Sequence, residues 1–285
     1  MHTLISIQVT ENNLLYQQSN IFYRSIGKGK RVMLLHGFAE DGSIWNNQIA
    51  FLKNHFRLLI PDIPGSGRSA VLADGNIETY TEVIKAILAN DFLQSGYEGL
   101  EEVTIIGHSM GGYIALAFAE KYPHLLPAFG LFHSTAFADN EEKKLARAKA
   151  IHFIKDKGSL PFLQTSIPGL FTQAFAEQHA TVINELIHRA KEFSPEALVQ
   201  YYEAMIQRPN RTSVLKNFPG PILFIIGEKD NVIPLESSLR QCYLPAQAHI
   251  HIIEKSAHMG MLEEPQKSDL ILYDFLFQKA SSSTP

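Results

Sequence analysis

The pentapeptide Gly107–Gly111, GHSMG, constrains the fold more than any other segment of this chain. It follows the apolar run Val103–Ile106 directly and leads into the helical pattern Tyr113–Ala119. Glycines on both sides of Ser109 let a strand turn sharply into a helix, because side chains there would clash. The turn lifts the serine hydroxyl clear of a sheet and leaves free amides at the helix start. The segment predicts a strand–turn–helix unit with a nucleophilic serine, the alternative being a plain glycine-rich helix start.

Short apolar runs alternate with helical patterns in the first half of the chain and again near its end. The runs expected to form strands are Val32–Leu35, Arg57–Ile60, Val103–Ile106, Ala128–Phe132, Ile222–Ile226 and His249–Ile253. The helical patterns between and after them are Ile44–Leu52, Ile77–Leu93, Tyr113–Ala119, Leu235–Tyr243 and Gln266–Lys279. Strands that are apolar throughout and alternate with helices indicate a mostly parallel sheet covered on both faces. The predicted fold class is therefore α/β.

The alternation stops between about Ala136 and Arg211, where helical patterns occur without a convincing strand. Those helical patterns are Glu141–Lys157, Val182–Glu192 and Pro195–Gln207, and the stretch Leu160–Phe175 between them is apolar. A helical insert in such a series is expected to cover the carboxyl edge of the sheet, where ligands bind in α/β folds. The predicted organisation is a core of residues 1–135 and 212–285 with a helical cap of residues 136–211.

A serine hydroxyl is a weak nucleophile until a base takes its proton, and His258 is the candidate base. It lies in SAHMGMLEEP, between the last predicted strand and the last predicted helix. The base in turn needs a carboxylate that fixes its tautomer. Asp230, which ends GEKD after the run ILFII, is the candidate acid. Glu228 and Asp139 remain alternatives, the latter because it follows an earlier predicted strand.

The segment Asp62–Ser69, DIPGSGRS, overlaps a stretch, Gly65–Ala70, that matches the dinucleotide fingerprint G-x-G-x-x-A. The context argues against nucleotide binding. Pro61 and Pro64 precede the match, no helical pattern opens after it, and no acidic residue ends a strand about twenty residues further on. The segment is interpreted as a structured turn beside the active site.

The segments HGF, DIPGSGRS, GHSMGG, GEKD and AHMGMLEEP occur in this order over nearly the whole chain. Together they resemble the α/β-hydrolase superfamily, and in particular its small cap-bearing esterases and meta-cleavage-type C–C hydrolases. The resemblance implies the triad order Ser109, Asp230, His258. It also implies that the oxyanion hole consists of the backbone N–H groups of Phe38 and Met110. A serine nucleophile argues against the dehalogenase and epoxide hydrolase branches, which use aspartate.

The expected activity is hydrolysis of a small, largely apolar carboxylic ester through an acyl-enzyme. The apolar stretch of the cap offers residues that would line the acyl pocket or only dock the cap on the core: Phe162, Leu163, Ile167, Leu170 and Phe171. Three other uses of the same fold stay open. They are C–C hydrolysis of a diketone-like substrate, a lyase or acyltransferase reaction, and a ligand-binding receptor that retains the triad.

Composition limits the partners and the compartment. The net charge of −4 gives no reason to expect nucleic acid or an anionic membrane as a partner. The single cysteine, Cys242, allows no intrachain disulfide. The first residues resemble no secretory signal, and no stretch approaches the ~18 apolar residues of a membrane span. A cytoplasmic enzyme of a small-molecule substrate is therefore expected, without metal or cofactor and with no prediction of oligomeric state.

Overall fold

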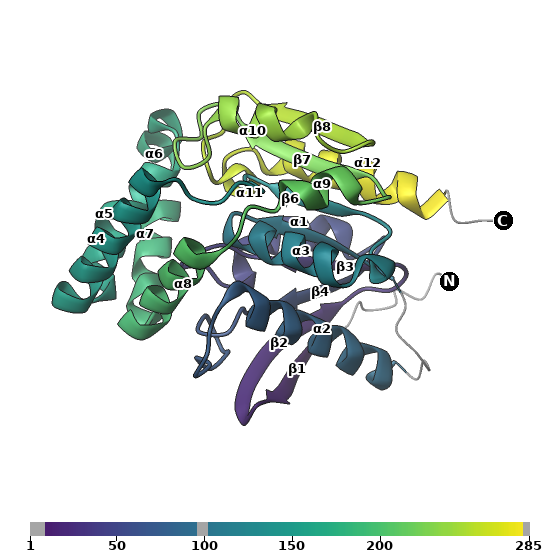
Figure 1. Ribbon diagram of the computed structural model, residues 1–285, viewed down its shortest axis with the longest axis horizontal. Coiled ribbons are helices and arrows are strands. Elements are labelled where there is room, and N and C mark those ends of the chain that lie inside the picture. The colour runs from purple at the N-terminus through teal and green to yellow at the C-terminus, as the bar shows by residue number, and fades with distance from the viewer. Residues whose placement is uncertain (1–8, 96–101, 282–285) are drawn as a thin grey trace, which may run out of the picture.

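The computed structural model describes residues 9–95 and 102–281, and its centre is one eight-stranded sheet (Figure 1). The strands lie in the order β1-β2-β4-β3-β5-β6-β7-β8. Their bounds are β1 Val9–Tyr16, β2 Ser19–Ile26, β3 Arg31–Leu35, β4 Arg57–Pro61, β5 Val103–His108, β6 Phe129–Phe132, β7 Ile222–Gly227 and β8 Ala248–Ile253. All neighbours from β4 to β8 pair in parallel, whereas β1 with β2 and β2 with β4 pair antiparallel. The α/β fold class is thus confirmed, and the first eight residues, which bear on the predicted compartment, lie outside the described part.

The antiparallel hairpin of β1 and β2 was not anticipated from the sequence. β1 lies at the edge of the sheet, and most of its side chains are exposed. Its sequence VTENNLLY therefore lacks the continuous apolar run that marks the central strands. Every residue of β3, β5 and β7 is buried, as expected for strands covered on both faces.

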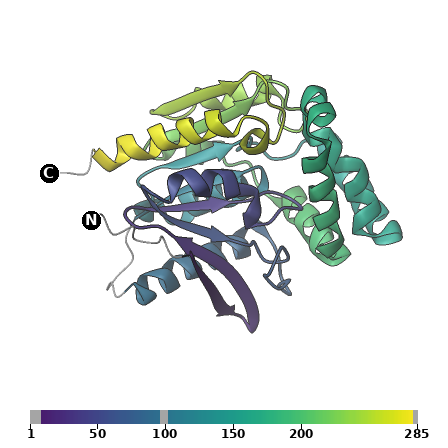
Figure 2. The same ribbon diagram turned by 180° about the vertical axis from the view of Figure 1, so that it is seen from behind.

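Helices cover both faces of the sheet. Figure 1 shows α2 and α3 in front of it, and Figure 2 shows the long yellow α12 and the dark blue α1 on the opposite face. The bounds of the helices outside the insert are α1 Asn46–Leu52, α2 Ile77–Gln94, α3 Met110–Lys121, α10 Leu235–Cys242, α11 Gly260–Glu263 and α12 Pro265–Ser281. The buried faces join one continuous apolar core around the central strands, and each Å² of buried apolar surface contributes about 25 cal/mol.

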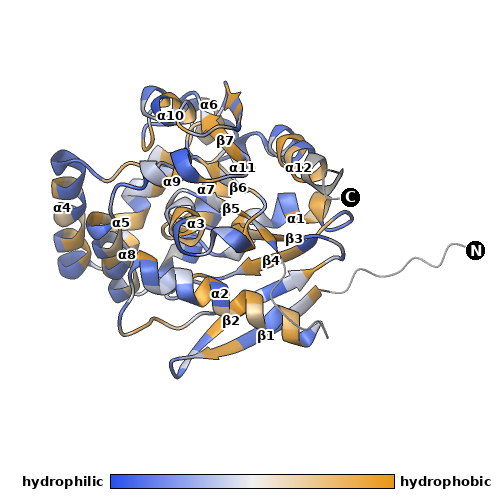
Figure 3. Cartoon of the chain, turned by 45° about the vertical axis from the view of Figure 1, so that its right-hand side comes forward, coloured by the Kyte–Doolittle hydropathy of each residue, from blue (hydrophilic) through white to orange (hydrophobic). Residues whose placement is uncertain are grey.

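A run of helices, here called the insert, interrupts the series between β6 and β7. It consists of α4 Glu141–Lys157, α5 Ser159–Ser166, η3 Ile167–Leu170, α6 Gln173–Gln178, α7 Ala180–Arg189, η4 Ala190–Glu192, α8 Pro195–Gln207 and α9 Thr212–Asn217. Most of it stands at one end of the sheet (Figure 1). Figure 3 shows α4 at the edge of the molecule as largely hydrophilic, whereas central strands such as β4 are hydrophobic. The predicted helical insert is therefore present.

The insert is tied to the core through α8. The Tyr201 hydroxyl donates to the Pro64 carbonyl at 2.8 Å and lies 3.2 Å from the Ile63 carbonyl, in the turn predicted to lie beside the site. The side-chain amide of Gln200 donates to the Leu72 carbonyl at 2.8 Å. These bonds hold α8 over the loops that leave the carboxyl ends of the strands. Among the described helices, none combines the length and apolar character that crossing a bilayer requires.

Candidate active site

Ser109 occupies the tight turn between β5 and α3. Its backbone angles are φ 49° and ψ −114°, a strained conformation that costs about 1–3 kcal/mol in a residue other than glycine. A Cβ atom at Gly107 would lie 2.3 Å from the Gly111 carbonyl oxygen, and one at Gly111 would lie 2.6 Å from the His36 carbonyl oxygen. Only glycine fits at these two positions, which is the packing reason for the GHSMG pattern. The Ser109 amide donates to the Phe132 carbonyl at 3.0 Å, so the turn is anchored to the neighbouring strand.

Asp230 and His258 meet at the carboxyl ends of β7 and β8. His258 Nδ1 lies 2.8 Å from Asp230 Oδ2, and both side chains are buried. The other carboxylate oxygen of Asp230 accepts from the amides of Val232 (2.8 Å) and Ile233 (2.9 Å). Burial opposes ionisation, but the hydrogen bond and electrostatic attraction from His258, together with the neighbouring His133, hold the pKa of Asp230 well below its usual range. The acid is thus an oriented, ionised partner for the imidazole.

The two alternative acids are engaged elsewhere. Asp139 lies 2.6 Å from Arg147 Nε and 2.9 Å from an Nη atom of Arg208. Glu228 is partly exposed and lies 3.0 Å from Lys229 Nζ. Within the described residues, neither contacts the candidate histidine base. The structure therefore brings Asp230 to this histidine and keeps both alternatives away from it.

A second histidine lies against the same acid and was missed by the sequence analysis. His133 follows β6 with a φ of 48°, and its Nδ1 lies 3.4 Å from Asp230 Oδ2 and accepts from the Gly227 amide at 3.0 Å. Burial lowers the pKa of His133 to about 4, although Asp230 opposes this. A Cβ atom at Gly260 would lie 2.5 Å from His133 Nε2, so the ring is tightly enclosed. Its position directly after a central strand was the available sequence signal.

Glu40 and His108 form a buried pair that contacts the backbone of His258. Glu40 Oε2 lies 2.9 Å from His108 Nδ1 and accepts from the Gly37 amide at 2.7 Å. His108 Nε2 lies 2.9 Å from the His258 carbonyl oxygen. Burial opposes both charges, but the mutual attraction wins: the pKa of Glu40 is lowered and that of His108 is raised. The pair connects the loop after β3 to the loop that carries His258.

The two predicted oxyanion donors flank the serine. A Cβ atom at Gly37 would lie 3.1 Å from Ser109 Cβ. The loop His36–Phe38 therefore passes directly beside the tight turn at Ser109, here called the elbow. His36 holds that loop in place, because its Nε2 accepts from the Ile63 amide at 2.8 Å. In the part of the chain that is described, the Phe38 amide donates no hydrogen bond to another loop or strand, and Met110 is the first residue of α3. The oxyanion hole formed by Phe38 and Met110 stays a prediction.

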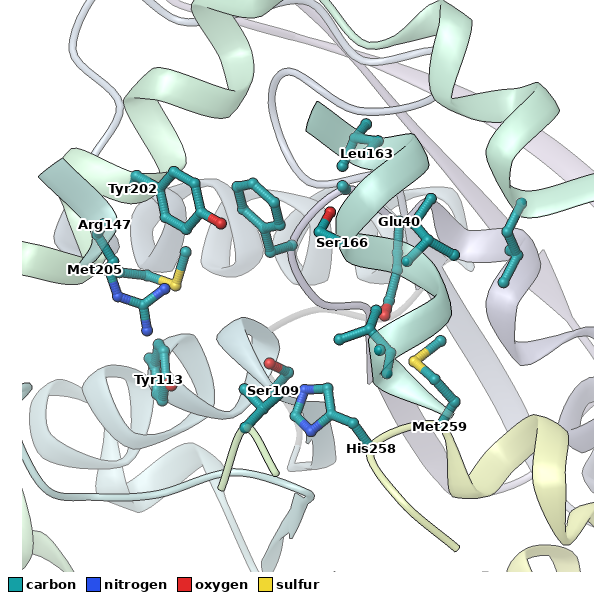
Figure 4. Close-up of a pocket in the computed structure, with 17 residues that line it drawn as sticks. Glu40, Ser109, Tyr113, Arg147, Leu163, Ser166, Tyr202, Met205, His258 and Met259 are labelled. Atoms are coloured by element: carbon teal, nitrogen blue, oxygen red, sulfur yellow. The ribbon is translucent and has the colours of Figure 1, made fainter. Parts of the chain in front are cut away.

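A cavity of about 310 Å³ opens above Ser109, between the core and the insert (Figure 4). Ser109 and His258 lie side by side on its wall. Its apolar lining includes Phe38, Leu163, Ile167, Leu170, Leu186, Met205, Val232 and Met259, and its polar lining includes Glu40, Tyr113, Arg147, Ser166 and Tyr202. Such a mostly apolar cleft with a few polar groups is typical of a small-molecule site.

The structure divides the five predicted pocket residues. Leu163, Ile167 and Leu170 line the cavity, whereas Phe162 and Phe171 are not among its lining residues. The Phe162 ring packs edge-on against Phe38, with 6.5 Å between the ring centroids, and the Phe171 ring stacks on Phe175 at 5.3 Å. Phe162 lies in α5 next to Leu163, which lines the cavity, because successive helical residues point to different sides. Phe171 follows η3 in an extended conformation and packs within the insert.

The comparisons with known proteins agree with this geometry. The Alpha/beta hydrolase family matches residues 32–267. Over 283 residues the chain is 25% identical to the 2-hydroxy-6-oxononadienedioate/2-hydroxy-6-oxononatrienedioate hydrolase of Paraburkholderia phymatum, covering 90% of this chain and 91% of that protein. Over 263 residues it is 24% identical to 3-oxoadipate enol-lactonase 2 of Acinetobacter baylyi, with coverage of 90% and 92%.

Among solved structures, a thermophilic esterase from Thermogutta terrifontis, with malate bound, superposes with a TM-score of 0.86 at 25% identity, covering 95% of this chain and 99% of that chain. The elbow, the cavity and the strand order are those of the α/β-hydrolase fold. The chain belongs to the alpha/beta hydrolase family and is a hydrolase, as the order of its motifs predicts.

Proposed function

We propose that this protein hydrolyses a small carboxylic ester through an acyl-enzyme formed on Ser109. The observation that carries the proposal is the geometry at the elbow. A strained serine lies beside His258 at a mostly apolar cavity, and the 2.8 Å contact between His258 Nδ1 and Asp230 Oδ2 orients the imidazole. Nucleophile, base and orienting acid are the three parts that ester hydrolysis by serine requires.

The reaction follows from the position of each group. Ser109 Oγ attacks the ester carbonyl carbon while His258 Nε2 takes its proton, and Asp230 stabilises the imidazolium that forms. The amides of Phe38 and Met110 hold the oxyanion. When the tetrahedral intermediate collapses, His258 returns the proton to the leaving alcohol. A water molecule, deprotonated by the same histidine, then attacks the acyl-enzyme and releases the acid.

C–C bond hydrolysis of a diketone-like substrate is the second candidate function. The Paraburkholderia phymatum relative is by name a hydrolase of a 2-hydroxy-6-oxo-dienedioate, and the same triad geometry suits attack on a ketone carbonyl. The esterase similarity, at the same identity over 95% of this chain, favours the ester instead.

Turnover of p-nitrophenyl acetate and butyrate, followed by release of nitrophenolate, tests the proposal. The wild-type protein should release nitrophenolate and Ser109→Ala should not. A panel of dienoic diketones run beside the esters separates the two candidates. Faster turnover of a diketone than of every ester would favour C–C hydrolysis, and no turnover of either class would favour a ligand-binding receptor.

A further inference from the structure

The cavity wall carries a guanidinium group that the proposed reaction does not use. Arg147 projects from α4 into the cavity, and its side chain is 16% exposed. Its Nε atom donates to Asp139 at 2.6 Å. Among the described residues, its two terminal nitrogens have no hydrogen-bond partner. Figure 4 shows Arg147, Tyr202, Met205 and Tyr113 grouped on one side of Ser109, with His258 and Met259 on the other.

The charges around Arg147 do not balance. Asp139 is shared, because its Oδ1 accepts from Arg208 at 2.9 Å while its Oδ2 accepts from Arg147. Arg208 also donates hydrogen bonds to the carbonyls of Met205 and Phe137. Among the described residues, two guanidinium groups therefore face one carboxylate, which leaves one positive charge without a paired carboxylate. Among the residues that line the cavity, the carboxylate is Glu40, and it is paired with a histidine. Burial of an unbalanced charge is costly unless a ligand of opposite charge completes it.

Two tyrosines lie on the same side of the cavity as Arg147 (Figure 4). Tyr113 and Tyr202 both line it, and within the described residues neither hydroxyl makes a hydrogen bond. The Arg147 guanidinium carbon lies 5.5 Å from the centre of the Tyr202 ring. Burial raises the pKa of Tyr202 to about 12, although Arg147 opposes this, so its hydroxyl keeps its proton and can donate. Guanidinium and phenol donors together are the groups that recognise a carboxylate.

We propose that Arg147, Tyr113 and Tyr202 form a carboxylate-binding subsite and that the substrate is an ester carrying a free carboxylate. The apolar wall formed by Leu163, Ile167 and its neighbours would hold the chain that joins the carboxylate to the ester group. A cavity of about 310 Å³ is at the lower end of small-molecule sites and suits a short chain. The inference rests on the proposed ester hydrolysis, and it replaces the largely apolar ester expected from the sequence by one that carries a charge at one end.

Matched substrates test the subsite. Monomethyl succinate, glutarate and adipate are compared with the methyl esters in which a primary amide replaces the free carboxylate, since the two differ in charge and not in shape. Methyl-ester cleavage is followed by acid release at constant pH. Acetyl esters of short hydroxy acids, with their amides, form a second arm that places the carboxylate on the alcohol side. In one of these two substrate sets, the wild-type protein should prefer the carboxylate over its amide by about 10- to 100-fold in kcat/KM. The set that shows the preference identifies whether the acyl or the alcohol part of the ester carries the carboxylate.

Substitution of the arginine should remove this preference. In Arg147→Met the ratio of carboxylate to amide should fall to near one, while Arg147→Lys should retain part of it. Tyr202→Phe should lower the ratio by a smaller factor without removing a charge. Lys155→Met, an exposed change on the same helix, is the matched control and should leave the ratio as in the wild type. Equal rates on carboxylate and amide in the wild type, or an unchanged ratio in Arg147→Met, would overturn the subsite.

Binding to an inactive variant separates this inference from the proposed function. Calorimetry on Ser109→Ala should detect glutarate or adipate binding that weakens at least tenfold when Arg147→Met is added. If no ester is cleaved but this binding is present, the ester proposal fails and the subsite stands. If esters are cleaved but no dicarboxylate binds in an Arg147-dependent manner, the subsite fails alone.

Discussion

The backbone amide of His258 donates a hydrogen bond of 2.9 Å to the carbonyl of Leu170, a residue of the insert. A second bond lies close by. The Thr172 amide, also in the insert, donates to Glu263 Oε1 at 2.7 Å, and Glu263 Oε2 accepts from the Ala257 amide at 2.8 Å. The loop that carries the candidate base is thus fastened to the insert at two points. Its orientation depends on the insert as well as on the core.

Glu263→Gln should disturb the histidine loop, because a neutral amide cannot accept both sets of backbone hydrogen bonds equally well. Lost hydrogen bonds to a buried charged group cost about 1.5–3 kcal/mol, so the midpoint of urea unfolding should fall. We also expect kcat to fall more than KM rises. Glu264→Gln, the neighbouring residue, is the control. A stability loss with unchanged kcat would show that the bridge does not position His258.

Asp230→Asn should lower kcat by about 10³- to 10⁴-fold, because an amide releases the histidine tautomer. Glu228→Gln and Asp139→Asn should cost far less, since neither acid touches His258 in the described structure. Ester kinetics on the three purified variants decide between the acids. If Asp139→Asn were the crippling change, the assignment of the acid would be wrong.

His133 should make stability depend on pH between about 4 and 6.5. Its pKa in the folded protein is lowered to about 4, whereas an unfolded histidine titrates near about 6.5. Between these values the unfolded chain binds the additional proton, so the free energy of unfolding falls as pH falls, by up to about 1.4 kcal/mol per pH unit. His133→Asn should flatten this slope in urea unfolding at pH 5 and 6. An identical slope in both proteins would contradict the shift.

Leu163→Ala should change acyl-chain preference, because Leu163 lines the cavity and is almost fully buried. One or two methylenes of pocket contact alter relative kcat/KM by roughly ten- to two-hundred-fold. Phe171→Ala serves as the contrast, since this ring stacks on Phe175 away from the cavity. It should lower stability by about 3–5 kcal/mol with little change in preference. A series of p-nitrophenyl esters from acetate to octanoate measures both, and the reverse pattern would place Phe171 at the substrate.

The central sheet and the place of the candidate triad were predictable because strict local rules govern them. Glycine is the only residue type that fits at positions 107 and 111 of the turn. Fully apolar runs mark the buried parallel strands. The edge hairpin of β1 and β2 follows no such rule, because one exposed strand carries an ordinary polar sequence.

The polar side of the cavity could not be found from the sequence. Arg147 lies in the charged segment EEKKLARAKA, where nothing local separates a cation aimed into a cavity from its solvated neighbours. The packing of α4 against α8 and α5 gives it that direction. The positions of Phe162 and Phe171 could not be predicted either. An apolar stretch indicates that its residues are buried, but it does not indicate which residues they pack against.

Labelling with a fluorophosphonate probe, followed by peptide mass spectrometry, tests the central claim most directly. The probe reacts only with a serine that is activated by a neighbouring base. A single adduct on Ser109 is predicted, and it should be lost in Ser109→Ala together with about 10⁴- to 10⁶-fold in kcat on p-nitrophenyl butyrate. An adduct on another serine, or near-normal esterase activity in the folded Ser109→Ala protein, would contradict the account.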